Sequence, residues 1–232
     1  MDSQKVALLV DALRAQGFTD VCDKYKDNWG LVDTELRHIC TERCIGHAFF
    51  AVAYPKVVII DEAYNAGLAR SLREPRDPAF NAQRAVAEWL SGPGREAIDA
   101  AVSARRASAV ATSAWLSVCL AMHGRVVQGL STLGATKSWP TSFVSKYLHF
   151  HNANFVVYDN EVDERLRKLL AESWSVKTVR CEPLDTSETP SYAKAYLSYL
   201  NRFAYYMDAG ELVRPGTTVK ELDHFLWNRP EL

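Results

Sequence analysis

Apolar residues recur every three or four positions along most of the chain, the spacing that places side chains on one face of an α-helix. In residues 3–15 the repeat runs through Val6, Leu9, Val10 and Leu13, and it stops at Gly17. The same spacing predicts helices over 79–90, over an Ala-rich stretch that ends near residue 107, and over 114–130. No segment shows sustained alternation of apolar and polar residues, so we expect an all-α fold.

Two neighbouring segments are harder to assign. Apolar positions from Leu36 to Ala48 step by three and four, which predicts a helix with Asp33 as its cap and Pro55 as its stop. The run "KVVII" at 56–60 is short and β-branched. It fits either a strand or a buried helical turn.

The C-terminal part carries a broad aromatic face over residues 191–207, made of Tyr192, Tyr196, Tyr199, Leu200, Phe203 and Tyr206. We expect a helix that closes at Gly210 and buries these rings in the core. The alternative is a platform on which nucleobases stack. A further helix over 219–226 follows a threonine cap at 217–218.

Composition narrows the class of protein. Hydrophobic residues make up 48% of the 232 residues and charged residues 24%, and no low-complexity linker interrupts them, so we expect one compact domain over 1–232. The net charge of −1 gives no global attraction to nucleic acid or to an anionic membrane. No stretch approaches the roughly 18 apolar residues of a membrane helix.

The N-terminal stretch lacks the basic flank and long apolar core of a secretion signal. We therefore expect a cytoplasmic protein with no membrane partner. The five cysteines then fit reduced thiols.

The most informative stretch is 142–162, "SFVSKYLHFHNANFVVYDNEV". Its first helix places Ser142, Ser145, Lys146 and His149 opposite the apolar face. An apolar connector then delivers Asp159 to the start of a helix over 160–170, in which Val162, Leu166, Leu169 and Leu170 are expected to be buried and Asp163, Glu164, Arg167 and Lys168 exposed. Lys146 and Asp159 are either a surface charge and a helix cap or a pair that does chemistry.

A lysine on the second helix of a hairpin, a short connector and an aspartate opening the next helix resemble the helix-hairpin-helix DNA glycosylases. "TSFVSKYLHF…FVVYDNEV" and the ending "LDHFLW" resemble the small bacterial proteins of the 8-oxoguanine DNA glycosylase fold. The resemblance implies two helical lobes around a cleft, a lead-in lobe over 1–112 and a helix-hairpin-helix lobe over 113–232.

The resemblance also implies a chemistry: Lys146 would attack the sugar C1′ of a damaged nucleotide and form a Schiff base, and Asp159 would stabilise the positive charge on the sugar. Where the family usually has Gly-x-Gly, this chain has Thr141, Ser142 and Ser145 as candidate contacts to phosphate. His149 and His151 are candidate contacts to phosphate or base. The partner would be DNA or a modified nucleotide, and no cofactor is implied.

Two alternatives remain open. Similar bacterial proteins occur with antiviral defence genes, so the same fold could serve as a catalytically inactive base-binding or protein-interaction subunit of a defence system, with a protein partner. Separately, Cys40, Cys44 and His47 would share a helical face suited to zinc, but the CxxC spacing typical of zinc sites is missing, and we expect no metal.

Overall fold

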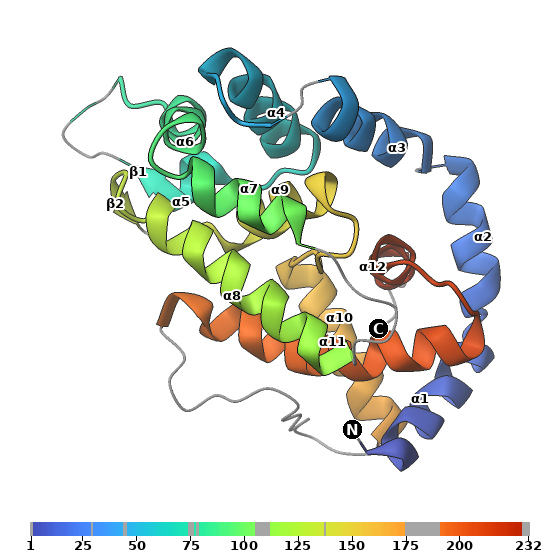
Figure 1. Cartoon of the computed structure of the whole chain (residues 1–232). Helices are drawn as coiled ribbons and strands as arrows, with labels where there is room; N and C mark the ends of the chain where they lie inside the picture. The colour runs from blue at the N-terminus through green and yellow to red at the C-terminus, as the bar shows by residue number, and fades with distance from the viewer. Residues whose placement is uncertain are drawn as a thin grey trace. The chain divides into compact units, whose positions relative to one another are not determined.

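The computed structural model describes residues 2–28, 30–43, 46–73, 77, 79–104, 112–136, 138–174 and 191–228 (Figure 1). Helices form nearly all of the regular structure in these ranges, which confirms the all-α expectation. One short antiparallel pairing joins β1, Leu72–Arg73, to β2, Ala135–Thr136. No helix in the described part of the chain is both long and apolar enough to cross a membrane.

The chain forms two compact units from alternating segments. Unit 1 comprises Met1–Leu31, Ala107–Val118 and Val156–Leu232, and unit 2 comprises Val32–Arg106 and Cys119–Phe155. This division differs from the expected lobes over 1–112 and 113–232. The expectation of a single domain with those lobes stays a prediction.

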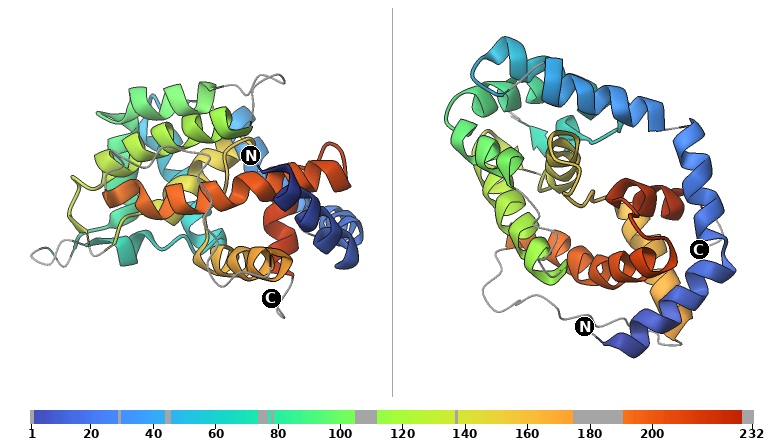
Figure 2. Two further views of the ribbon diagram at one scale, coloured as in Figure 1. Left: turned by 90° about the horizontal axis from the view of Figure 1, so that it is seen from below. Right: turned by 45° about the vertical axis from the view of Figure 1, so that its right-hand side comes forward.

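The longest helix of unit 1, α11 (Lys194–Val213), packs against three of its other helices. The elements of unit 1 are α1 (Ser3–Ala15), α2 (Phe18–Asn28), the start of α8 (Thr112–Leu130), α10 (Asn160–Trp174), the 3-10 turn η2 (Ser191–Ala193), α11 and α12 (Val219–Trp227). Helix α1 packs against α11 and α10, and α12 packs against α2 and α10 (Figure 2). The predicted helix over 3–15 is confirmed, with Val6, Leu9, Val10 and Leu13 buried.

The aromatic face of α11 forms the core of unit 1. Phe18 of α2 lies 5.0 Å from Phe225 and 6.5 Å from Tyr206, measured between ring centroids. The hydroxyl of Tyr196 donates to the Val156 carbonyl at 2.7 Å, and that of Tyr206 donates to the Leu222 carbonyl at 2.9 Å. The rings of Tyr196, Tyr199, Phe203 and Tyr206 are fully buried and that of Tyr192 is half-buried, which confirms the core interpretation over the stacking platform.

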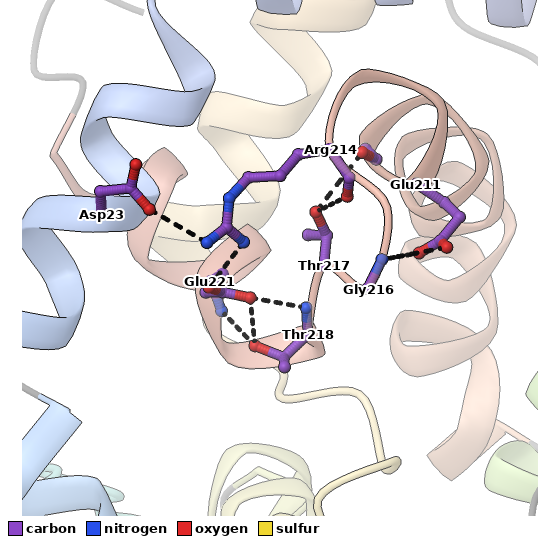
Figure 3. Close-up of polar contacts among 8 residues, drawn as sticks. Asp23, Glu211, Arg214, Gly216, Thr217, Thr218 and Glu221 are labelled. Carbon is purple, nitrogen blue, oxygen red and sulfur yellow. Dashed lines mark hydrogen bonds and ion pairs between the residues drawn. The ribbon is translucent and has the colours of Figure 1, made fainter.

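The turn between α11 and α12 is held by a polar network (Figure 3). Thr218 and Glu221 form a capping box, because each side chain accepts a hydrogen bond from the backbone N–H of the other. Arg214 donates to Glu221 at 2.9 Å and to Asp23 of α2 at 3.0 Å. The predicted threonine cap is confirmed, whereas the predicted end at Gly210 is wrong, since α11 continues to Val213.

Unit 2 contains a helix, α9 (Thr141–His151), that is almost entirely buried. The elements of unit 2 are most of α3 (Gly30–His38), the π-helical turn η1 (Ile39–Arg43), α4 (Phe50–Ala63), α5 (Leu68–Ser71), β1, α6 (Ala82–Ser91), α7 (Arg95–Ser103), the rest of α8, β2 and α9. Helix α9 packs against α4, α7 and η1. Every residue of α9 is buried except Ser142, which is half-buried.

The helix predicted from Asp33 to Pro55 is wrong at both ends. Asp33 lies inside α3, where it is buried, and residues 46–49 are not helical. Pro55 lies within α4 instead of ending it. The hydrogen bond that a proline removes is outweighed here by the burial of Ala53, Val57 and Ile60 on the same helix. Residues 56–60 are therefore a buried helical turn.

Candidate functional site

Lys146 is held inside unit 2 by a main-chain carbonyl. Its side chain lies on α9 and is only 5% exposed, so the interpretation of Lys146 as a surface charge is wrong. The side-chain nitrogen Nζ donates to the carbonyl of Tyr64 at 3.0 Å. Tyr64 is the C-terminal cap residue of α4, where carbonyls lack partners within the helix. Lys146 therefore binds the end of another helix.

Asp159 directly precedes the first residue of α10 in unit 1. Its carboxylate Oδ1 accepts the Glu161 N–H at 3.0 Å, and its carbonyl accepts the Asp163 N–H at 2.9 Å. The helix-cap interpretation is therefore confirmed as one role of this residue. Lys146 belongs to unit 2 and Asp159 to unit 1, and their convergence on one substrate stays a prediction.

The candidate phosphate contacts lie at the start of α9. Thr141 and Ser145 are buried and Ser142 is half-buried. The Ser145 hydroxyl donates to the Ser142 carbonyl at 2.9 Å, and His123 of α8 donates from Nε2 to the Thr141 carbonyl at 3.1 Å. Contact of these hydroxyls with phosphate stays a prediction.

The candidate base contacts His149 and His151 are both buried. Each uses Nδ1 to donate to a backbone carbonyl at 2.8 Å, that of Phe155 for His149 and that of Tyr147 for His151. A carbonyl can only accept, so both rings carry the proton on Nδ1. Burial lowers the pKa of His151 well below its usual value, with the nearby charge of Lys56 acting in the same direction.

A second polar cluster, in which His47 and Tyr147 are buried and Asp99 is partly exposed, was not predicted from the sequence. His47 Nδ1 lies 2.9 Å from Asp99 Oδ1, and its Nε2 lies 3.0 Å from the hydroxyl of Tyr147. The carboxylate must accept, so Nδ1 donates to Asp99 and the Tyr147 hydroxyl donates to Nε2. Burial lowers the pKa of His47, although the hydrogen bond to Asp99 acts against that shift. These residues stand 52 and 100 positions apart, so no local spacing reveals them.

This cluster also bears on the zinc alternative. Both ring nitrogens of His47 are engaged by Asp99 and Tyr147, and Cys44 lies outside the described residues. Within the ranges that the structure describes, no group of histidine, cysteine and acidic side chains is arranged to hold a metal ion.

A pocket of about 300 Å³ lies along α3 and η1. It is lined by Thr34, Glu35, Arg37, His38, Thr41, Glu42 and Arg43. None of the site residues predicted from the sequence is among them, and its wall carries both acidic and basic side chains. The pocket therefore adds no support to the chemistry predicted for Lys146.

The chain matches no known protein family model, no curated protein and no solved structure.

Proposed function

We propose that the protein is a DNA glycosylase with lyase activity, which cleaves the N-glycosidic bond of a damaged or modified base through a Schiff base on Lys146. The burial of this amine on a packed helix supports the proposal most directly. A nucleophilic lysine must be removed from bulk water and held on a rigid element, and a solvated surface lysine satisfies neither condition.

In the proposed reaction Lys146 first gives its extra proton to water. The lone pair of the resulting amine forms a bond to C1′ while the bond from C1′ to the base breaks. The base leaves with the bonding electrons and takes up a proton. Positive charge develops on the sugar during this step, and Asp159 is proposed to stabilise it. Loss of a proton from nitrogen and opening of the sugar ring then give the Schiff base.

The order of the elements supports the same proposal. Helix α8, the hairpin over 131–140, α9, the connector over 152–159 and α10 follow one another as in the helix-hairpin-helix arrangement. Lys146 lies on the second helix of the hairpin, and Asp159 opens the helix after the connector. The specific glycosylase fold is part of this proposal.

The test is covalent trapping with borohydride on duplex oligonucleotides that contain either 8-oxoguanine or an abasic site. We expect wild-type protein to give an adduct and Lys146→Gln to give none. Lys56→Gln is the matched control, because Lys56 is also buried and also donates to a carbonyl, that of Gly46 at 2.9 Å. Each substitution removes the hydrogen bond from the amine to its carbonyl, and loss of that bond should cost about 1 kcal/mol of stability.

An adduct that persists in Lys146→Gln, or that disappears equally in Lys56→Gln, would contradict the assignment.

A second candidate function is the inactive base-binding or interaction subunit. The engagement of Asp159 as a helix cap favours it, because a cap needs no catalysis to explain the carboxylate. Wild-type protein that traps neither oligonucleotide would leave this second candidate as the better account.

A further inference from the structure

The carbonyl that holds Lys146 belongs to a tightly constrained turn. Tyr64 ends α4, Asn65 adopts a positive φ of 44°, and Gly67 adopts a φ of 78°. Non-glycine residues rarely occupy this left-handed region, and they keep it only where their surroundings fix it. The chain therefore turns away from α4 directly after Tyr64, at positions occupied by the two residue types that adopt this conformation most readily.

Side chains on both sides of the turn fix it further. Asp61 accepts the Leu68 N–H on its carboxylate and the Ala66 N–H on its carbonyl, each at 3.0 Å. Arg70 donates to the carbonyl of Asn65 at 3.2 Å and to its side-chain oxygen at 3.1 Å. Asp61 of α4 and Arg70 of α5 therefore both hold the turn by hydrogen bonds.

The Tyr64 side chain adds two more attachments. Its hydroxyl donates to the carboxylate of Asp33, which is buried in α3. Its ring lies 4.8 Å from the ring of Phe150, measured between centroids. Phe150 follows Lys146 by four residues on α9, so the two share one face of that helix. Tyr64 therefore meets α9 at two successive turns, once through its carbonyl and once through its ring.

We infer that Tyr64 is the positioning residue of Lys146: its carbonyl sets the direction of the amine, and the attachment of its hydroxyl to Asp33 keeps that carbonyl in place. The catalytic meaning of this inference rests on the proposed function. The placement of the amine does not, and it can be measured separately.

The test is the reductive methylation of individual lysines with formaldehyde and cyanoborohydride, followed by peptide mass mapping. Tyr64→Phe keeps the ring and the carbonyl and removes the bond to Asp33. We expect Lys146 to be methylated several-fold faster in this variant, because the Tyr64 carbonyl loses its attachment to α3 and holds the amine less firmly, while the methylation of Lys56 stays unchanged. Asp33→Asn retains an acceptor oxygen and should behave like wild-type protein, whereas Asp33→Ala should resemble Tyr64→Phe.

The matched control is Tyr206→Phe, which removes a buried hydroxyl bonded to a carbonyl in unit 1. It should leave the methylation of Lys146 unchanged. In the borohydride assay with abasic DNA, Tyr64→Phe should slow adduct formation by roughly tenfold to a hundredfold, the usual cost of a misplaced reacting group, with DNA affinity unchanged.

The possible results separate the two proposals. Faster methylation of Lys146 in Tyr64→Phe, with no DNA adduct even from wild-type protein, would support the positioning role and overturn the proposed function. Equal methylation of Lys146 in wild-type protein and Tyr64→Phe would overturn the positioning role whatever the DNA assay gives. A parallel rise at Lys56 would also overturn it, because that pattern indicates general loosening of unit 2.

Discussion

A buried ion pair joins two helices of unit 1. Asp163 of α10 is 3% exposed and accepts hydrogen bonds from Arg202 of α11, including one at 2.9 Å from Nε. Its other carboxylate oxygen accepts from Arg167. Removing one partner of such a pair leaves a charge in the core with no compensation.

We predict that Asp163→Ala lowers the free energy of unfolding by about 3–5 kcal/mol, as measured by urea denaturation. Glu164→Ala, one position along the same helix, removes only an exposed contact to Lys168 and should cost less than about 0.5 kcal/mol. Similar losses in the two variants would show that Asp163 is not a structural charge.

His123 gives the stability of unit 2 a dependence on pH. Burial lowers its pKa from 6.5 to about 4, although the hydrogen bond to the Thr141 carbonyl acts in the opposite direction. Because the unfolded chain binds this proton first, stability is retained above pH 6.5 and lost as the pH falls towards 4. The difference corresponds to about 3 kcal/mol.

We predict that His123→Gln, which keeps a donor near the Thr141 carbonyl, loses clearly less stability than wild-type protein between pH 6.5 and 4. Urea denaturation at several pH values measures this. His47 and His151, whose pKa values are also lowered, should leave some dependence in the variant. Parallel curves for the two proteins would contradict the prediction.

For individual residues, the sequence predicted the local role in a helix better than the contacts with distant parts of the chain. It placed Asp159 correctly at a helix start and expected Asp163 to be exposed, which is wrong because Arg202 approaches it from 39 positions away. It also set Lys146 and His149 on a polar face, although both are buried. The spacing of residues within one helix does not reveal which carbonyl or charged group of a distant segment will contact a polar side chain.

Helix α12 starts with a capping box formed by Thr218 and Glu221. In the capping box, Glu221 N–H donates to Thr218 Oγ1 at 3.2 Å and Thr218 N–H donates to Glu221 Oε2 at 2.8 Å. We predict that Thr218→Ala costs about 1 kcal/mol of stability in urea denaturation, because it leaves an N–H of the first turn without this acceptor. Thr19→Ala, at an exposed position within α2, is the control and should change stability by less than about 0.5 kcal/mol. Equal effects at both positions would argue against the cap.

The regular apolar spacing predicted helices well where it persisted and failed where the helical period changed. It identified α1, α6, α8 and α10, but it carried one helix through 33–48, where the structure has a π-helical turn and then a non-helical segment. A π turn adds one residue to the repeat, which a fixed spacing of three and four cannot represent.

For the whole molecule, the alternating segments of the two units predict how fragments behave. A cut after residue 112 leaves parts of unit 1 and parts of unit 2 in both products. We predict that neither fragment 1–112 nor fragment 113–232 unfolds cooperatively, as followed by circular dichroism during heating, because neither contains a complete core. A cooperative transition in either fragment would instead support the lobes predicted from the sequence.

The same arrangement determines how the molecule responds to mechanical force. Asp2 and Asn228, near the two ends of the described chain, both belong to unit 1. Pulling on the termini therefore loads unit 1 directly, through the packing of α1 against α11. The segments of unit 2 lie between the two terminal segments of unit 1 in the sequence. We therefore expect unit 1 to unfold under tension before force is applied to unit 2.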